Sequence, residues 1–130
     1  MVTAENILEE KGGRMITVAP EATLQEAVQV MLNHNVGSVL VEEDGRVVGI
    51  WSERDLLRQT VQAGFHPNTA RLRDYMVSPV PSARHDATIF NLMDRFLGLR
   101  IRHLLVEKEG RPIGLLSAGD VMKATLEMKN

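Results

Sequence analysis

The chain has 130 residues, of which 44% are hydrophobic and 25% are charged, as is usual for globular domains. Its net charge of −2 argues against a nucleic-acid-binding protein, because neutralising phosphates needs a basic surface. The sequence contains no cysteine, no apolar window of about twenty residues and no signal-peptide pattern. We therefore expect a cytoplasmic protein without disulfides or a membrane span.

The first predicted elements are a strand and a helix. Residues 15–18 have the character of a short strand. Thr23 and Glu26 then form a capping box, in which a hydroxyl and a carboxylate satisfy free amide groups at the start of a helix. The apolar residues that follow have the spacing of an amphipathic helix: Leu24, Ala27, Val28, Met31 and Leu32.

A β-hairpin and a second helix are predicted next. Strands at residues 37–42 and 46–51 flank Asp44 and Gly45, a dipeptide typical of tight hairpin turns. Ser52 is a suitable N-cap for a helix that continues to about residue 63. The first half of the chain therefore has the order β-α-β-β-α.

The second half repeats the first at an offset of 65 residues, without gaps. Ala22-Thr23 matches Ala87-Thr88, and Leu40-Val41-Glu42 matches Leu105-Val106-Glu107. The same elements are therefore expected again, after a loop at 64–68 and a short helix at 71–76: a helix with its apolar stripe at 89–97, strands at 102–106 and 111–116, and a last helix from Ser117. One copy is too short to bury its apolar faces, so we expect two copies to pack as one domain.

Both copies contain one polar motif, GIWSERD at 49–55 and GLLSAGD at 114–120. It has a structural interpretation, in which the serine and aspartate cap a helix and the glycine permits close packing. It also has a functional interpretation. The free amide groups at a helix N-terminus can bind phosphate, and a carboxylate can accept hydrogen bonds from two ribose hydroxyls. Ile50 and Trp51 could line a slot for a base.

The two copies, at residues 16–57 and 81–122, and the lead-in DYMVSPV at 74–80 carry a family resemblance. The sequence resembles a pair of cystathionine-β-synthase (CBS) motifs, together called a Bateman module. The resemblance implies an α+β fold of two β-α-β-β-α units, related by a pseudo-twofold axis, with their sheets packed together. We expect one module over residues 1–130, with the following parts: a first motif at 4–62, a linker at 63–73 and a second motif at 74–128.

The resemblance also implies two clefts between the motifs that bind an adenosyl ligand: AMP, ADP, ATP or possibly NAD or S-adenosylmethionine. No cofactor is required. The main cleft would be formed by Ile50, Ser52, Arg54, Asp55, Val80, Ser82, Ala87, Ile101, Arg102 and His103. The second cleft would be formed by Thr17, Ala22, Val36, Gly37, Ser38, Leu115, Ser117 and Asp120.

The two clefts differ in charge. By the resemblance, Asp55 would hold the ribose and Ser52 would approach a phosphate, while the cations that could meet phosphate charge are Arg54, Arg102 and His103. The second cleft has Gly119 and Gly37-Ser38 at the matching positions, and so no comparable cation. We therefore expect the main cleft to take the phosphorylated ligand. The second is expected to be weak, empty or suited to something less charged.

The resemblance covers nearly the whole chain and leaves no room for a catalytic domain, so we expect a stand-alone regulatory module that is not an enzyme. Its output would need an effector protein, which the sequence does not identify. A homodimer is expected through apolar residues of the second helices: Leu56, Leu57, Val61, Val121, Met122 and Leu126. The alternative is a structural or protein-interaction module with vestigial, ligand-free clefts.

Two further expectations concern single residue types. Trp51 is expected in the core more than as a platform for a base. The four histidines show no metal-ligand spacing, so no metal site is expected.

Overall fold

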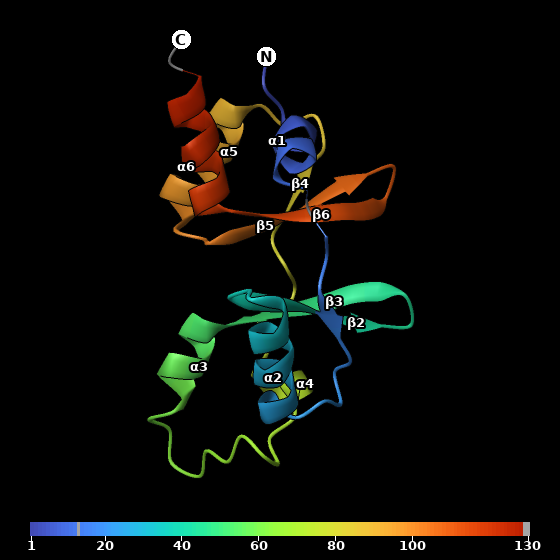
Figure 1. Ribbon diagram of the computed structural model, residues 1–130, viewed down its shortest axis with the longest axis vertical. Coiled ribbons are helices and arrows are strands. Elements are labelled where there is room, and N and C mark those ends of the chain that lie inside the picture. The colour runs from blue at the N-terminus through green and yellow to red at the C-terminus, as the bar shows by residue number, and fades with distance from the viewer. Residues whose placement is uncertain (13, 129–130) are drawn as a thin grey trace. The chain divides into compact units, whose positions relative to one another are not determined.

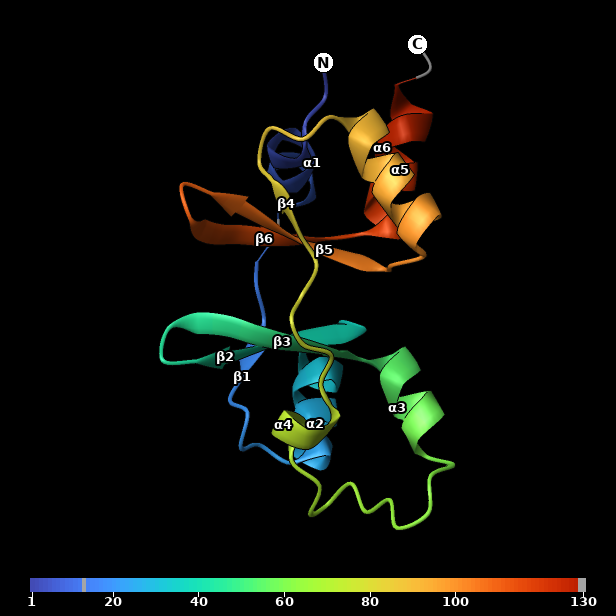
Figure 2. The same cartoon turned by 180° about the vertical axis from the view of Figure 1, so that it is seen from behind.

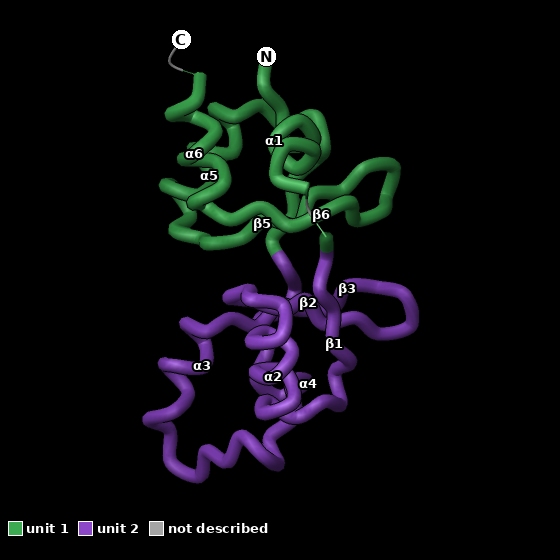
Figure 3. Tube along the Cα trace, viewed as in Figure 1, with its two compact units in different colours: residues 1–14, 81–130 green, residues 15–80 purple. Residues whose placement is uncertain are grey.

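The computed structural model describes residues 1–12 and 14–128, and the chain divides into two compact units (Figure 3). Unit 2 is Met15–Val80, and unit 1 combines Met1–Arg14 with Pro81–Asn130. Unit 2 therefore contains the first sequence repeat, whereas unit 1 contains the second repeat together with the N-terminal segment.

Unit 2 contains a three-stranded sheet with helices on one of its faces (Figure 1). Its elements are β1 (Thr17–Val18), α2 (Leu24–His34), β2 (Ser38–Glu43), β3 (Arg46–Ser52), α3 (Glu53–Gln59) and α4 (Leu72–Tyr75). The strand order is β1-β2-β3, in which β1 is parallel to β2 and β2 is antiparallel to β3.

Unit 1 repeats this arrangement, and Figure 2 shows its helices from behind. Its elements are α1 (Ala4–Lys11), β4 (Ser82–Arg84), α5 (Ile89–Leu99), β5 (His103–Lys108), β6 (Arg111–Ser117) and α6 (Ala118–Glu127). The order β4-β5-β6 has the same parallel and antiparallel pairs. The predicted β-α-β-β-α order is confirmed in both repeats, and the α+β class with it.

The two hairpins have the turns that the sequence predicts. Asp44 and Gly45 have φ angles of 53° and 77°, and Glu109 and Gly110 have φ angles of 52° and 77°. Positive φ at both central residues defines the type I′ turn, whose twist matches that of the flanking strands. Each hairpin also has a register shift, just after Val41 or Val106, so even this irregularity is repeated.

The helices bury a narrower apolar stripe than the spacing suggests. Leu24, Ala27 and Met31 of α2 are buried, but Leu32 is exposed, as is its counterpart Leu97 in α5. Leu32 follows Leu24 by eight residues, which turns it about 80° around the helix, so it lies at the margin of the buried face.

Two predicted boundaries differ from the structure. Helix α3 ends at Gln59 and not near residue 63, and the Thr60 hydroxyl donates to the Leu57 carbonyl at 2.8 Å there. Helix α1 was not predicted, and it lies in unit 1, whereas the sequence analysis assigned residues 4–62 to the first motif. Its Ile7 and Leu8 belong to the core of the second repeat.

Helices α1 and α4 dock in equivalent ways, each on the repeat that it does not precede in the sequence. The first amide of α1, at Ala4, donates to the Ala87 carbonyl at 2.9 Å. The first amide of α4, at Leu72, donates to the Ala22 carbonyl at the same distance. Since Ala22 and Ala87 are 65 residues apart, they are one position in the two repeats. Each repeat is thus completed by a helix from outside its own segment.

This docking explains the repeated glycine. A Cβ atom added to Gly49 would lie 2.9 Å from Met76 Cγ, and one added to Gly114 would lie 2.7 Å from Leu8 Cδ2. Both glycines therefore let a side chain from a docked helix, or from the residue that ends it, approach the strand backbone. The close-packing interpretation of these glycines is supported in both units.

Candidate functional site

The Ser-x-x-Asp segments begin the last helix of each repeat, as the sequence predicts. The Ser52 hydroxyl accepts from the Asp55 amide at 3.3 Å, and Asp55 Oδ2 accepts from the Ser52 amide and hydroxyl at 3.0 and 2.9 Å. The Ser117 hydroxyl accepts from the Asp120 amide at 3.1 Å, and Asp120 Oδ2 accepts from the Ser117 amide at 2.8 Å. Both segments are complete capping boxes, so the structural interpretation holds for both.

Asp55 is nearly buried, with 7% of its side chain exposed. Its Oδ1 atom pairs with Arg58, which lies three residues later on α3 and is itself mostly exposed. The carboxylate that the resemblance assigns to a ribose is therefore held by its own turn and by an exposed arginine of the same helix.

Asp120 has a different cation. The Lys11 ammonium donates to Asp120 Oδ2 at 2.8 Å and to the Leu115 carbonyl at 2.9 Å. Burial raises the pKa of Asp120, but the hydrogen bonds from Lys11 and Ser117 together outweigh it, so the pKa lies below the usual range. Asp120 is therefore a charged carboxylate that is paired with a residue of α1.

The expectation that the second cleft lacks a cation is wrong for the residues around Asp120. Lys11 is 109 positions away in the sequence, and it reaches Asp120 because α1 docks on the second repeat. The sequence did carry a signal for the helix: Thr3 caps it, and Gly12 ends it in a left-handed conformation. No spacing rule, however, indicates which repeat this helix contacts.

The predicted hairpin entrances lie beside the capped turns within each unit. The Gly37 carbonyl accepts from the Glu53 amide at 2.9 Å, and the Arg102 carbonyl accepts from the Ala118 amide at 3.0 Å. Strand pairing also places Ser38 opposite Ser52 in unit 2, and His103 opposite Ser117 in unit 1.

The other candidate residues lie along the same sheets. Thr17 pairs with Leu40, and Val36 follows the end of α2. The candidate cations Arg54 and Arg102 are exposed, whereas His103, Ile101 and Val80 are half-buried. Ile50 is buried on β3, and it points to the opposite face from Trp51 because side chains alternate along a strand.

The main-cleft residues are divided between the two units. Unit 2 contains Ile50, Ser52, Arg54, Asp55 and Val80, and unit 1 contains Ser82, Ala87, Ile101, Arg102 and His103. The second cleft is divided in the same way, with Leu115, Ser117 and Asp120 in unit 1. Within each unit the structure places the capped turn of one predicted cleft beside the hairpin entrance assigned to the other, and the complete clefts stay a prediction.

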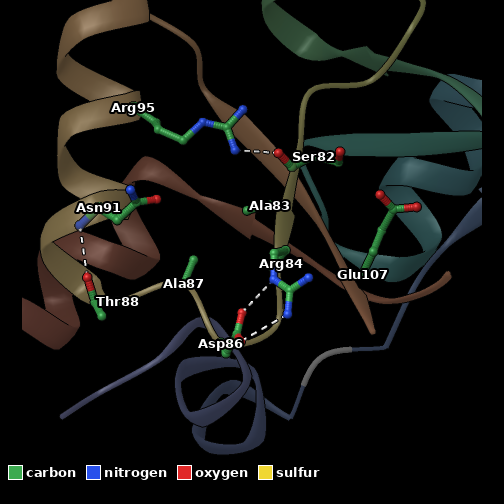
Figure 4. Close-up of a pocket in the computed structure, with 9 residues that line it drawn as sticks. All are labelled: Ser82, Ala83, Arg84, Asp86, Ala87, Thr88, Asn91, Arg95 and Glu107. Atoms are coloured by element: carbon green, nitrogen blue, oxygen red, sulfur yellow. Dashed lines mark hydrogen bonds and ion pairs between the residues drawn. The ribbon is translucent and has the colours of Figure 1, made fainter. Parts of the chain in front are cut away.

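A pocket of about 520 Å³ lies within unit 1 beside β4 and the start of α5 (Figure 4). Two candidate residues, Ser82 and Ala87, line it. The Arg95 guanidinium donates to the Ser82 carbonyl, and Arg84 pairs with Asp86. Sequence analysis did not single out Arg95, although the matching residue of the first repeat is the apolar Val30 and a cation at that position was a visible signal.

The structure shows that Trp51 and Val121 are both core residues. Trp51 is fully buried, and its indole N–H donates to Gln59 at 2.9 Å, so it belongs to the core and is not a platform for a base. Val121 is also buried, and it therefore offers no surface for a second chain.

Within the described residues, no helix is long and apolar enough to cross a membrane. The same residues contain no group of three or more histidine, aspartate or glutamate side chains placed to hold a metal ion.

Comparison with known proteins identifies relatives of the chain. The CBS domain family matches residues 13–61 and 72–127. The mitochondrial CBS-domain-containing protein CBSX3 of Arabidopsis thaliana is 29% identical over 133 residues, which cover 95% of this chain and 65% of that protein. The chain thus spans just under two thirds of this relative.

Solved structures show the same fold. A CBS-domain-containing protein of Agrobacterium tumefaciens is 34% identical and superposes with a TM-score of 0.88, covering 95% of this chain and 99% of that one. CBSX2, solved in complex with AMP, superposes with a TM-score of 0.81 over the full length of both chains at 20% identity.

Proposed function

Because this chain belongs to the CBS domain family, we propose that it is a ligand-sensing regulatory module and not an enzyme. An adenosyl ligand (AMP, ADP, ATP, NAD or S-adenosylmethionine) binds between its two motifs. Each binding cleft uses residues from both motifs, so ligand changes how the motifs pack and the change is passed to an effector protein.

One observation carries this proposal. Asp55 and Asp120 occupy equivalent capped turns, and each turn lies beside the hairpin entrance of its own repeat. A carboxylate at this position can accept hydrogen bonds from ribose hydroxyls while its amide neighbours hold it in place. The AMP bound to CBSX2, a protein of the same fold, supports a nucleotide as the ligand class.

In the main cleft, several candidate residues have a proposed contact with the ligand. Asp55 holds the ribose, Ile50 lies against the base, and Ser52 is close to a phosphate. Arg54 and Arg102 are exposed, so both are accessible to phosphate charge.

Thermal unfolding with each of the five adenosyl compounds tests the proposal. Ligand at about 100 times its dissociation constant adds roughly 2.7 kcal/mol of stability, which raises the Tm of a domain of this size by several degrees. We expect one compound to raise the Tm of the wild type, and its effect to be lost or much reduced in Asp55→Ala.

The shift is compared with and without ligand for each variant, because Asp55→Ala also weakens a cap. Asp94→Ala is the matched control, since Asp94 is an exposed aspartate of α5 outside the candidate clefts. It should keep the full ligand shift. If none of the five compounds shifts the wild type, the nucleotide proposal fails.

The alternative function, an interaction module with ligand-free clefts, is favoured by a different observation. Ser52 and Asp55 already satisfy each other, as do Ser117 and Asp120, so both motifs have a structural role without any ligand. This alternative predicts no nucleotide response and a loss of about 1 kcal/mol of stability in Asp55→Ala.

We also propose a homodimer through the last helix of each repeat. Four of the six predicted apolar residues are exposed: Leu57, Met122 and Leu126 on these helices, and Val61 just after the end of α3. Paired chains would cover these side chains, whereas Leu56 is half-buried and Val121 is buried within its own unit. Light scattering after size exclusion tests this proposal, and a monomer at tens of micromolar would contradict it.

A further inference from the structure

We propose that Lys11 binds the phosphate of a nucleotide whose ribose is held by Asp120, so that the second cleft also binds phosphorylated ligands. This inference rests on the proposed nucleotide function and adds to it the residue that sets ligand preference at one site. It reverses the expectation, drawn from Gly119 and Gly37-Ser38, that the second cleft suits a less charged ligand.

The first support is the position of the Lys11 ammonium. It lies 2.8 Å from Asp120 and 2.9 Å from the Leu115 carbonyl, and both of these residues belong to the predicted second cleft. An ammonium has three N–H donors, and these contacts use two of them. Lys11 is thus already at the carboxylate that would hold the ribose, with a donor to spare.

The second support is that the Lys11 side chain is accessible to a ligand. Its side chain is 39% exposed, and with Asp120 it lines a cavity of about 400 Å³ between α1 and α6. The other charged residues of the cavity are Glu10, Lys123 and Glu127. A lysine carries its charge on a flexible four-carbon stem. A nucleoside phosphate carries its charge on the same ribose that Asp120 would hold, which puts that charge within the neighbourhood of the Lys11 ammonium.

The third support is that this cation belongs to one repeat alone. Leu8 faces Gly114 as Met76 faces Gly49, so these two residues are equivalent at a sequence offset of 68, although α1 continues as a helix to Lys11 whereas α4 ends at Tyr75. By this offset Lys11 matches Pro79, which carries no charge. Lys11 therefore supplies Asp120 with a cation that is absent from the matching position of the other repeat.

Isothermal titration in an Asp55→Ala background isolates the Asp120 site. AMP and adenosine are the two probes, because they differ only by the phosphate. Lys11→Met should weaken AMP binding about 10- to 100-fold, the range expected for one charge-assisted hydrogen bond, and should change adenosine binding by less than about threefold. Lys11→Arg should restore most of the preference for AMP.

Lys123→Met is the matched control, because it removes an ammonium from the same cavity and leaves the Lys11–Asp120 contact in place. It should keep the preference for AMP. If Lys11→Met does not fold, Lys11→Gln replaces it. The inference is overturned if AMP and adenosine weaken equally, or if AMP binding does not change.

The inference and the nucleotide function fail in distinguishable ways. If AMP binds the wild type but not the Asp55→Ala protein, the second cleft is empty, and the inference falls while the proposed function stands. If AMP and the other adenosyl compounds do not bind the wild type, both fall.

Discussion

The two capped carboxylates have nearly the same turn but obtain their cations from different places. Asp55 pairs with Arg58, three residues further along its own helix, and only 7% of its side chain is exposed. Asp120 pairs with Lys11, which lies on α1, and 23% of its side chain is exposed. Local sequence thus determines both turns and the cation at Asp55, whereas tertiary docking determines the cation at Asp120.

This difference separates what duplication preserves from what it lets vary. Both repeats keep a capping box, a type I′ hairpin and a glycine below a docked helix, because each of these supports the fold. The cation beside the carboxylate comes from a different element in each repeat, so this feature differs between the repeats.

The largest expected effect is a loss of stability on replacing the two equivalent glycines, and it should differ between them. Gly49→Ala should lower the free energy of unfolding by about 1–3 kcal/mol, because the new Cβ would meet Met76 and also lie 3.1 Å from the Val77 carbonyl, which is backbone. Gly114→Ala should cost less, since the nearest atoms are the flexible end of Leu8. Urea unfolding of both variants measures the two losses.

Gly98→Ala is the control for these glycine variants. Gly98 lies on α5 with open space where a Cβ would be, so alanine should stabilise the protein by about 0.5–1 kcal/mol. Equal losses in Gly49→Ala and Gly114→Ala would contradict the distinction between backbone and side-chain contacts.

The next effect concerns the two serine caps. Ser52→Ala should cost about 1–2 kcal/mol and Ser117→Ala about 0.5–1 kcal/mol, because the Ser52 hydroxyl also donates to the nearly buried Asp55. Chemical denaturation gives both values. Threonine at either position keeps the hydroxyl and should restore most of the stability. A larger loss at Ser117 than at Ser52 would show that burial does not set the value of the cap.

The sequence predicted the parts of this fold that depend on local chemistry. Thr23 with Glu26, the turn at Asp44 and Gly45, and the caps at Ser52 and Ser117 are all as expected. Each of these signals acts within four residues; the hairpin turn and the serine cap occur in both repeats, whereas the counterpart of the Thr23 box at Thr88 has only the N-cap hydrogen bond.

The missing parts depend on contacts between distant segments. Helix α1 is in the second-repeat unit because Ala4 bonds to Ala87 and Leu8 packs on Gly114, across more than 80 residues. Lys11 follows from that docking. Periodicity cannot indicate which of two similar surfaces a short helix selects, so the charge at Asp120 could not be predicted from the sequence.

The smallest effect is a pH dependence that sharpens the contrast at Asp120. An aspartate in an unfolded chain titrates near 3.9, and the pKa of Asp120 lies below its usual range when the protein is folded. The charged carboxylate therefore adds stability above about pH 3.9, and this contribution is lost as the pH falls through the lower pKa of the folded state.

Lys11→Met should raise the pKa of Asp120, because burial remains while one of the stabilising hydrogen bonds is gone. NMR titration of the carboxyl carbons measures the change. Asp86, whose pKa is lowered by Arg84, should titrate identically in both proteins and serves as the internal control. If the pKa of Asp120 does not respond to Lys11→Met, the ammonium is not paired with it in solution, and the two carboxylates differ less than their contacts indicate.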